Sequence, residues 1–140
     1  MERVQSHRDL VVWQKAMELV VMVFRLTARF PKTETYGMVA QLTRAVTSVP
    51  ANVAEGNARG SRKDYANFIA VARGSLMETE TLLILAIRLE YTAPAEAQPA
   101  LSLVVEISKM LTALRSRLLQ GTRNREQGIG NREQGIGNRE

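Results

Sequence analysis

Apolar residues recur at helical spacing in four stretches of the chain, and alternating strand patterns are nearly missing. The first stretch runs from about 9 to 29, where Asp9 is the expected N-cap and Phe30-Pro31 ends the helix. One apolar row consists of Leu10, Trp13, Met17, Val20, Phe24 and Ala28, and a second consists of Val12, Ala16, Leu19, Val23 and Leu26. Together the two rows cover roughly half the circumference, which predicts burial against more than one neighbour.

Three more helices follow with similar stripes. The second runs from about 34 to 57, the third from Ser61 to about 90, and the fourth from about 95 or 99 to 119, where Gly121 ends it. Ser61-x-x-Asp64 resembles a capping box. The expected core residues are Met38, Leu42, Ala45, Val46, Val49 and Val53; Tyr65, Phe68, Ala72, Leu76, Leu83, Ala86 and Ile87; and Leu103, Val104, Ile107, Met110, Leu111, Leu114 and Leu118. Four helices with short connections predict an all-α antiparallel up-down-up-down four-helix bundle over residues 9–120, after a flexible N-terminus at 1–8.

The stretch "SVPANVAEGNARGS", from Ser48 to Ser61, places Pro50 inside the second helix. A proline there removes one backbone hydrogen bond and clashes with the carbonyl of Val46. We therefore expect a kinked second helix, with a break into two pieces as the alternative.

The C-terminal segment has a different character. "NREQGIG" occurs at 124–130 and again at 131–137. Each repeat holds one large apolar residue and two glycines, so a coiled-coil seam is not supported. The polar, glycine-rich composition predicts a disordered tail over 121–140.

Composition agrees with one soluble domain. The chain has 140 residues, of which 45% are hydrophobic and 24% charged. Cysteine is absent, which excludes disulfides and fits a reducing cytoplasm. No apolar run is long enough to span a membrane, and the N-terminal "MERVQSHRDL" is too polar for a signal peptide. We expect a cytoplasmic protein with no membrane partner.

Catalytic and metal-binding patterns are missing. His7 is the only histidine and cysteine is absent, so the usual zinc sites cannot be assembled. A serine triad would need His7, and nothing in the sequence places His7 near a buried acid. "GNARGSRKD" lacks the spacing of a phosphate-binding P-loop. Glu78 and Glu80 are two residues apart, so their side chains diverge on a helix. We expect no enzyme, no metal and no cofactor.

A polar row lies beside the apolar face of the second helix. It consists of Gln41, Arg44, Ser48, Asn52 and Glu55, and Arg73 and Glu80 of the third helix are positioned to join it. One interpretation is a solvated side of the helix. The other is a packing or interface network of hydrogen bonds between helices or subunits, in which every buried group must be paired.

Positive charge gathers at one end of the expected bundle. An up-down arrangement brings together the start of helix one, the end of two, the start of three and the end of four. Seven basic and four acidic residues lie there, an excess of three positive charges, against an excess of one at the other end. The expected phosphate contacts are Arg59, Arg62, Lys63, Arg115 and Arg117, with Arg8 weaker. Ordinary surface charge is the alternative.

No aromatic residue for base stacking is expected among these cations, so nucleic-acid binding would carry little sequence preference. Contacts from several copies in an oligomer would strengthen it and steepen its salt dependence.

Three segments carry a family resemblance. They are "DLVVWQKAMELV", "TARFPKTETYGMVAQLTRAVTSVPANVAEGNAR" and "FIAVARGSLMETETLL". Their most specific parts are Val12-Trp13-Gln14-Lys15, Phe30-Pro31, Tyr36-Gly37, Ser48-Val49-Pro50, Asn52-Val53-Ala54-Glu55-Gly56 and Ala72-Arg73-Gly74-Ser75. In this order they resemble the four-helix-bundle family of 23S rRNA intervening-sequence proteins, over about 9 to 119. The repeat tail lies outside the family pattern.

The resemblance implies a bundle that assembles into a ring, with a pentamer as the expected homo-oligomer. It also implies a more distant similarity to the accessory proteins of diversity-generating retroelements, which partner a reverse transcriptase and bind nucleic acid through a basic ring surface. Our first hypothesis is a non-enzymatic homo-oligomer that binds RNA or DNA through the basic end. The alternative is an adaptor of a mobile element that docks a reverse-transcriptase-like protein, and a third is a structural bundle with no present role.

Overall fold

The computed structural model describes residues 6–134, with side chains as far as Gln120. The helices are α1 (Val11–Thr27), α2 (Ala40–Asn57), α3 (Arg62–Arg88) and α4 (Pro94–Gln134), with short turns η1 (His7–Asp9), η2 (Lys32–Glu34) and η3 (Thr35–Val39). No β-strand occurs within residues 6–134. The all-α four-helix fold is therefore confirmed.

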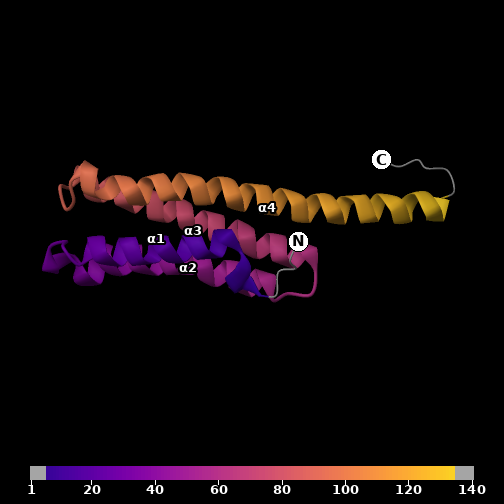
Figure 1. Ribbon diagram of the computed structural model, residues 1–140, viewed down its shortest axis with the longest axis horizontal. Helices are drawn as coiled ribbons and strands as arrows, with labels where there is room; N and C mark the ends of the chain where they lie inside the picture. Colours follow the sequence, from indigo (N-terminus) through magenta and orange to yellow (C-terminus); the bar gives the residue numbers. More distant parts are fainter. Residues whose placement is uncertain (1–5, 135–140) are drawn as a thin grey trace.

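Side-chain contacts fix the relative direction of the helices. Lys15 Nζ lies 3.1 Å from Glu106 Oε2, and Arg29 Nη1 lies 2.9 Å from Glu96 Oε2. Later residues of α1 therefore meet earlier residues of α4, so these two helices are antiparallel. Figure 1 shows the same alternation throughout, with α1 and α3 running one way and α2 and α4 the other.

The core lies between the four helices. The expected apolar row of α2 is fully buried, from Met38 to Val53. On α1 only the second of the two expected apolar rows is buried in the core. Met17 and Phe24 of the first row are 41% and 48% exposed. A helix with two apolar rows packs only one of them when its neighbours in the bundle lie on one side.

The chain enters α1 differently from the prediction. Asp9 is not the N-cap of α1, which begins at Val11 after Leu10. Instead Asp9 and Ser6 form a capping box around η1: Ser6 Oγ accepts from the backbone N–H of Arg8 at 3.2 Å, and Asp9 Oδ2 accepts from that of Ser6 at 3.3 Å. Asp9 acts as the acidic third residue of that box, which removes it from the N-cap position of α1.

The second helix begins later than predicted, at Ala40 rather than near 34. Gly37 has non-helical backbone angles (φ −103°, ψ −106°) within the π-helical turn η3. Glu34 Oε1 accepts from the backbone N–H of Met38 at 3.1 Å and stabilises this irregular entry. From there α2 is continuous through Pro50, so the two-piece alternative is wrong, and the kink at Pro50 stays a prediction.

The third helix begins as predicted, since Ser61 Oγ accepts from the backbone N–H of Asp64 at 3.1 Å. It ends in a Schellman turn. The N–H of Tyr91 donates to the carbonyl of Ala86 at 2.9 Å, and that of Glu90 donates to Ile87 at 3.0 Å. Glu90 takes the left-handed position of this turn, with φ 64°.

The fourth helix is longer than predicted. It begins at Pro94 and continues through Gly121 to Gln134, so Gly121 does not end it. Glycine inside a helix costs about 1 kcal/mol but does not stop it, and no proline follows. The side chains of 121–134 and all of 135–140 lie outside the described residues, and disorder of the repeat tail stays a prediction.

Candidate nucleic-acid interface

The structure brings the six expected cations to one end of the bundle. We call this set the basic pole, and it comprises Arg8, Arg59, Arg62, Lys63, Arg115 and Arg117. Its described acids are Glu55, Asp9 and Asp64, so the excess is three positive charges. An exposed end with this excess attracts polyanions and releases their counterions.

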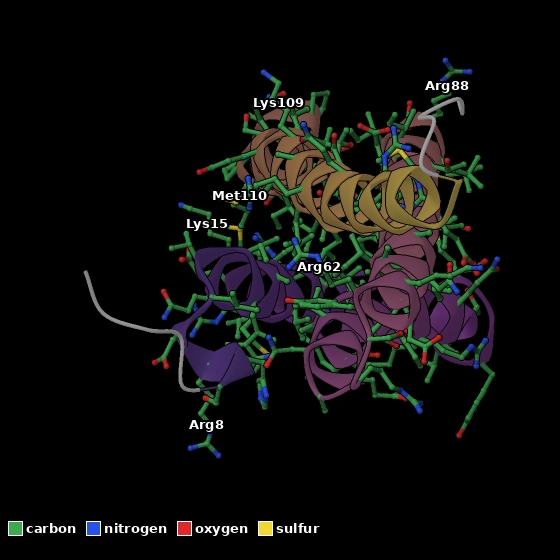
Figure 2. The ribbon with its side chains drawn as sticks, turned by 90° about the vertical axis from the view of Figure 1, so that its right-hand side faces the viewer. Arg8, Lys15, Arg62, Arg88, Lys109 and Met110 are labelled. Atoms are coloured by element: carbon green, nitrogen blue, oxygen red, sulfur yellow. The ribbon has the colours of Figure 1, made fainter. Side chains whose placement is uncertain are left out.

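Arg62 is engaged within the bundle. Its Nη2 donates to the carbonyl oxygen of Arg117 at 3.2 Å, and its Nε donates to that of Leu118 at 3.4 Å. Figure 2 shows Arg62 among the helices, whereas Arg8 points outward. Arg62 therefore ties the first turn of α3 to α4 and offers fewer free donors than its charge suggests.

Arg59 is also partly engaged. Its guanidinium carbon lies 4.6 Å from the centre of the Phe68 ring. The expectation that no aromatic residue lies among the cations is therefore wrong. The turn between α2 and α3 folds Arg59 back over α3, a contact that residue spacing alone does not reveal. Because the guanidinium covers it, the Phe68 face is not open to a base.

The remaining cations differ in exposure. Arg8, Lys63 and Arg117 are exposed, whereas Arg115 is half-buried. The Nε of Arg115 is buried and has no hydrogen-bond partner among the described residues. Arg115 is thus the member of the basic pole that lies partly inside a groove, and it is less exposed than Arg8, Lys63 and Arg117.

The polar row of α2 forms a partial network with α3. Ser48 Oγ lies 2.9 Å from Ser75 Oγ, and Asn52 Nδ2 donates to both the carbonyl and the hydroxyl of Ser48 at 2.8 Å. Gln41 Nε2 lies 3.5 Å from Glu78 Oε2. The partners Ser75 and Glu78 were missed because a helix-to-helix register cannot be obtained from spacing within one helix.

Four members of the predicted network are not brought into it, since their side chains make no hydrogen bond or ion pair with other described side chains: Arg44, Glu55, Arg73 and Glu80. Arg44, Glu55 and Arg73 are exposed and Glu80 is half-buried. Arg73 lines a pocket on the other flank of α3, between α3 and α4. The network thus consists of its uncharged members and the Gln41–Glu78 pair.

Groups of large apolar side chains are exposed on α1 and on α3. On α1, Met17, Val21 and Phe24 share one face and are 41–48% exposed, and we call them the α1 row. On α3 and its C-cap residue they are Val71, Ile84, Leu85 and Leu89, which we call the α3 row, at 41–53% exposure. Both sets agree with the sequence pattern, because the apolar face of the first helix covers roughly half its circumference and the run "LLILAI" is apolar nearly all round.

Two further properties bear on the class of site. No group of three or more histidine, cysteine or acidic side chains within the described residues is placed to hold a metal ion. Within the same part of the chain, every helix is too short or too polar to cross a membrane.

The fold defines an antiparallel four-helix-bundle protein with one basic end. Comparisons with known proteins identify its family. Residues 8–113 match the family model of the 23S rRNA-intervening sequence protein, and the chain belongs to this family. It is similar to a protein with unknown function from the S23 ribosomal protein family of Bacteroides thetaiotaomicron VPI-5482, with 29% identity, a TM-score of 0.68, and coverage of 75% of this chain and 98% of that chain. None of the curated proteins matches this sequence.

Proposed function

We propose that this protein is a non-enzymatic, homo-oligomeric four-helix bundle that binds RNA or other nucleic acid through the basic pole. The observation that carries the proposal is the gathering of exposed Arg8, Lys63 and Arg117 at one end, supplied by η1, α3 and α4. Lys and Arg side chains that neutralise phosphates provide most of the sequence-independent affinity for nucleic acid. The family's association with 23S rRNA intervening sequences supports RNA as the ligand.

The six cations are expected to contribute unequally. Arg62 donates to α4 carbonyls and Arg59 lies over Phe68, so both are partly occupied. Arg8, Lys63 and Arg117 are the principal phosphate contacts in this proposal. None of them is part of a base-reading aromatic platform, so binding should depend on salt far more than on sequence.

A homo-oligomer accounts for the exposed apolar rows. A closed ring uses two different patches on each copy, one meeting the other on the next copy. The α1 row and the α3 row provide two such patches on different helices. A pentamer is the ring that the family resemblance implies, and each added copy multiplies the phosphate contacts.

The nucleic-acid test is a filter-binding titration with a single-stranded RNA oligonucleotide at several salt concentrations. The variant Arg8→Gln/Lys63→Gln/Arg117→Gln should bind more weakly. Its slope of log affinity against log salt should fall by about 2 per bound copy, since each contact on a single strand contributes about 0.7.

A matched control removes three charges at the opposite end, with Arg25→Gln/Lys32→Gln/Arg88→Gln. All three of these side chains are exposed. The control should retain most of the affinity and the slope. Salt-independent binding, or equal losses in both triple variants, would contradict a basic-pole interface.

The oligomer test is multi-angle light scattering at micromolar concentration. The wild type should run as an oligomer, and Phe24→Glu should shift it toward the monomer because the substitution buries a charge in the α1 row. Val105→Glu on α4, where Val105 is 48% exposed, is the matched control and should not change the mass. A monomeric wild type refutes this part of the proposal.

A further inference from the structure

A pocket of about 360 Å³ opens between α3 and α4, on the flank of the bundle. Its lining residues are Arg73, Thr112, Arg115, Ser116, Leu119 and Gln120. Two guanidinium groups, two hydroxyls and an amide line this space, and no carboxylate of the described side chains, which end at Gln120, is part of the lining. Hydrogen-bond donors gathered without a carboxylate are typical of a site that binds an anion.

The charges of the two arginines also favour an anion as the ligand. Arg73 and Arg115 come from different helices and carry the same charge into one pocket. The ion pairs of the described residues lie elsewhere, at Lys15–Glu106 and Arg29–Glu96. Two unpaired cations in one groove repel each other, and an anion between them would reverse the sign of that interaction.

Arg115 supplies an independent observation. Its Nε is buried and has no hydrogen-bond partner among the described residues. Buried donors are normally satisfied, so this orphan donor shows that the described residues leave part of the hydrogen-bonding capacity of Arg115 unused. The planar guanidinium can present two parallel N–H groups to one oxyanion.

We propose that this pocket binds a phosphate group. A tetrahedral phosphate offers acceptor oxygens in several directions, which matches donors that come from α3 on one side and from successive turns of α4 on the other. The volume lies at the lower end of the range for small-ligand pockets and exceeds that of a bare ion, so an attached sugar can enter with the phosphate.

The site deepens the proposed function, on which it rests for the source of the phosphate but not for the anion itself. Arg73 follows Arg62 by eleven residues, which is about 16 Å along α3. At about 3.4 Å per nucleotide, that is a reach of roughly five nucleotides. A strand held at the basic pole can therefore place a backbone phosphate in the pocket.

The decisive experiment follows the Arg Nε–H signals of ¹⁵N-labelled protein by NMR during titration with inorganic phosphate. The signals of Arg115 and Arg73 should shift and saturate. Arg73→Gln should weaken binding at least about tenfold. Arg115→Lys keeps the charge but loses the planar guanidinium with its two parallel N–H donors, so it should weaken phosphate binding as well.

Lys109→Gln is the matched control, since Lys109 is exposed on α4, the helix that also carries Arg115 (Figure 2), and does not line the pocket. It should leave the titration unchanged. Signals that do not move with phosphate, or that respond equally in Lys109→Gln and Arg73→Gln, overturn the phosphate site.

A second arm uses the RNA oligonucleotide and separates the two proposals. Arg73→Gln should lower RNA affinity more than Lys109→Gln and reduce the salt slope by about 0.7, the contribution of one phosphate contact on a single strand. In one outcome, RNA binds the basic pole while Arg73→Gln and Lys109→Gln behave alike and phosphate shifts no arginine signal. In that case the proposed phosphate site is wrong and the proposed function stands. If phosphate saturates the arginine signals but no RNA binds, the pocket holds a phosphate from another source and the proposed function fails.

Discussion

The hydroxyl oxygens of Ser48 and Ser75 lie 2.9 Å apart and join α2 to α3 at the middle of the bundle. Asn52 Nδ2 donates to the Ser48 hydroxyl at 2.8 Å, so that oxygen is shared between two neighbours. All three side chains are half-buried, where a lost partner costs more than on the open surface. This small network fixes the register of the two helices that share the most extensive contact.

Ser48→Ala should destabilise the protein by about 1–3 kcal/mol, because it removes a partner of both Ser75 and Asn52. Ser75→Ala should cost about 0.5–1.5 kcal/mol, since Ser48 keeps its bond from Asn52. Urea unfolding of both variants and of the double variant gives the coupling, expected at about 0.5–1 kcal/mol. Thr47→Ala is the control, because the hydroxyl of Thr47 bonds only carbonyls of its own helix. Additive single effects would contradict a direct bond.

A second prediction concerns the close approach of α2 to α3 at Gly56. A Cβ there would lie 2.8 Å from the Cβ of Phe68 and 2.9 Å from Cδ1 of Tyr65. It would also lie 3.2 Å from the carbonyl oxygen of Tyr65, which cannot rotate away. Gly56→Ala should therefore force the helices apart and destabilise by about 1–3 kcal/mol.

Gly74→Ala is the matched control for this prediction. Gly74 is also inside a helix, but a Cβ there would meet nothing within 4 Å. The substitution should stabilise α3 by about 0.5–1 kcal/mol through helix propensity alone. Urea unfolding distinguishes the two positions, and destabilisation of similar size at Gly56 and Gly74 would show that the contact between the helices does not decide the cost.

The third prediction concerns the turn after α3. Glu90 occupies the left-handed position of a Schellman turn with φ 64°, where its Cβ is strained. Glu90→Gly should raise stability by up to about 1 kcal/mol in a thermal melt. Glu90→Ala removes the charge but keeps the Cβ, so it should show no gain. An Ala variant as stable as the Gly variant would assign the effect to charge rather than to backbone strain.

The sequence was sufficient for the helices and most of the core, but not for contacts between helices. The α2 row from Met38 to Val53 was predictable because it has one apolar face. On α1 both rows are apolar, and periodicity cannot decide which row packs in the core and which row stays exposed. Arg62 was predicted from its charge, yet its acceptors are backbone carbonyls more than fifty residues away.

The two arginines of the pocket likewise show that contacts between helices could not be predicted from the sequence. Arg73 and Arg115 were each singled out from the sequence, but for different reasons and in different sites. Only the register between α3 and α4 brings them into one groove. The predicted basic pole, by contrast, needed only the direction of each helix, which short connections determine.

The last prediction uses the contact between Tyr91 and Glu34 at the opposite end of the bundle. Tyr91 Oη donates to Glu34 Oε2 at 2.9 Å. This hydrogen bond, followed by burial and the repulsion of the carboxylate, raises the pKa of Tyr91 above 10.0. The folded chain therefore holds the phenolic proton more tightly than the unfolded chain. The resulting stability is fully present below pH 10 and is lost as pH rises through the raised pKa.

Tyr91→Phe should remove this alkaline loss while keeping the ring contact with Phe30, whose centroid lies 5.7 Å away. Thermal melts between pH 8 and 12 should show a steeper alkaline decline for the wild type than for Tyr91→Phe. Absorbance at 295 nm should show a late-titrating tyrosine that the variant lacks. Tyr36→Phe is the control, because Tyr36 is 95% exposed and should leave the decline unchanged. Identical alkaline curves for the wild type and Tyr91→Phe would mean that the Glu34 contact does not persist in solution.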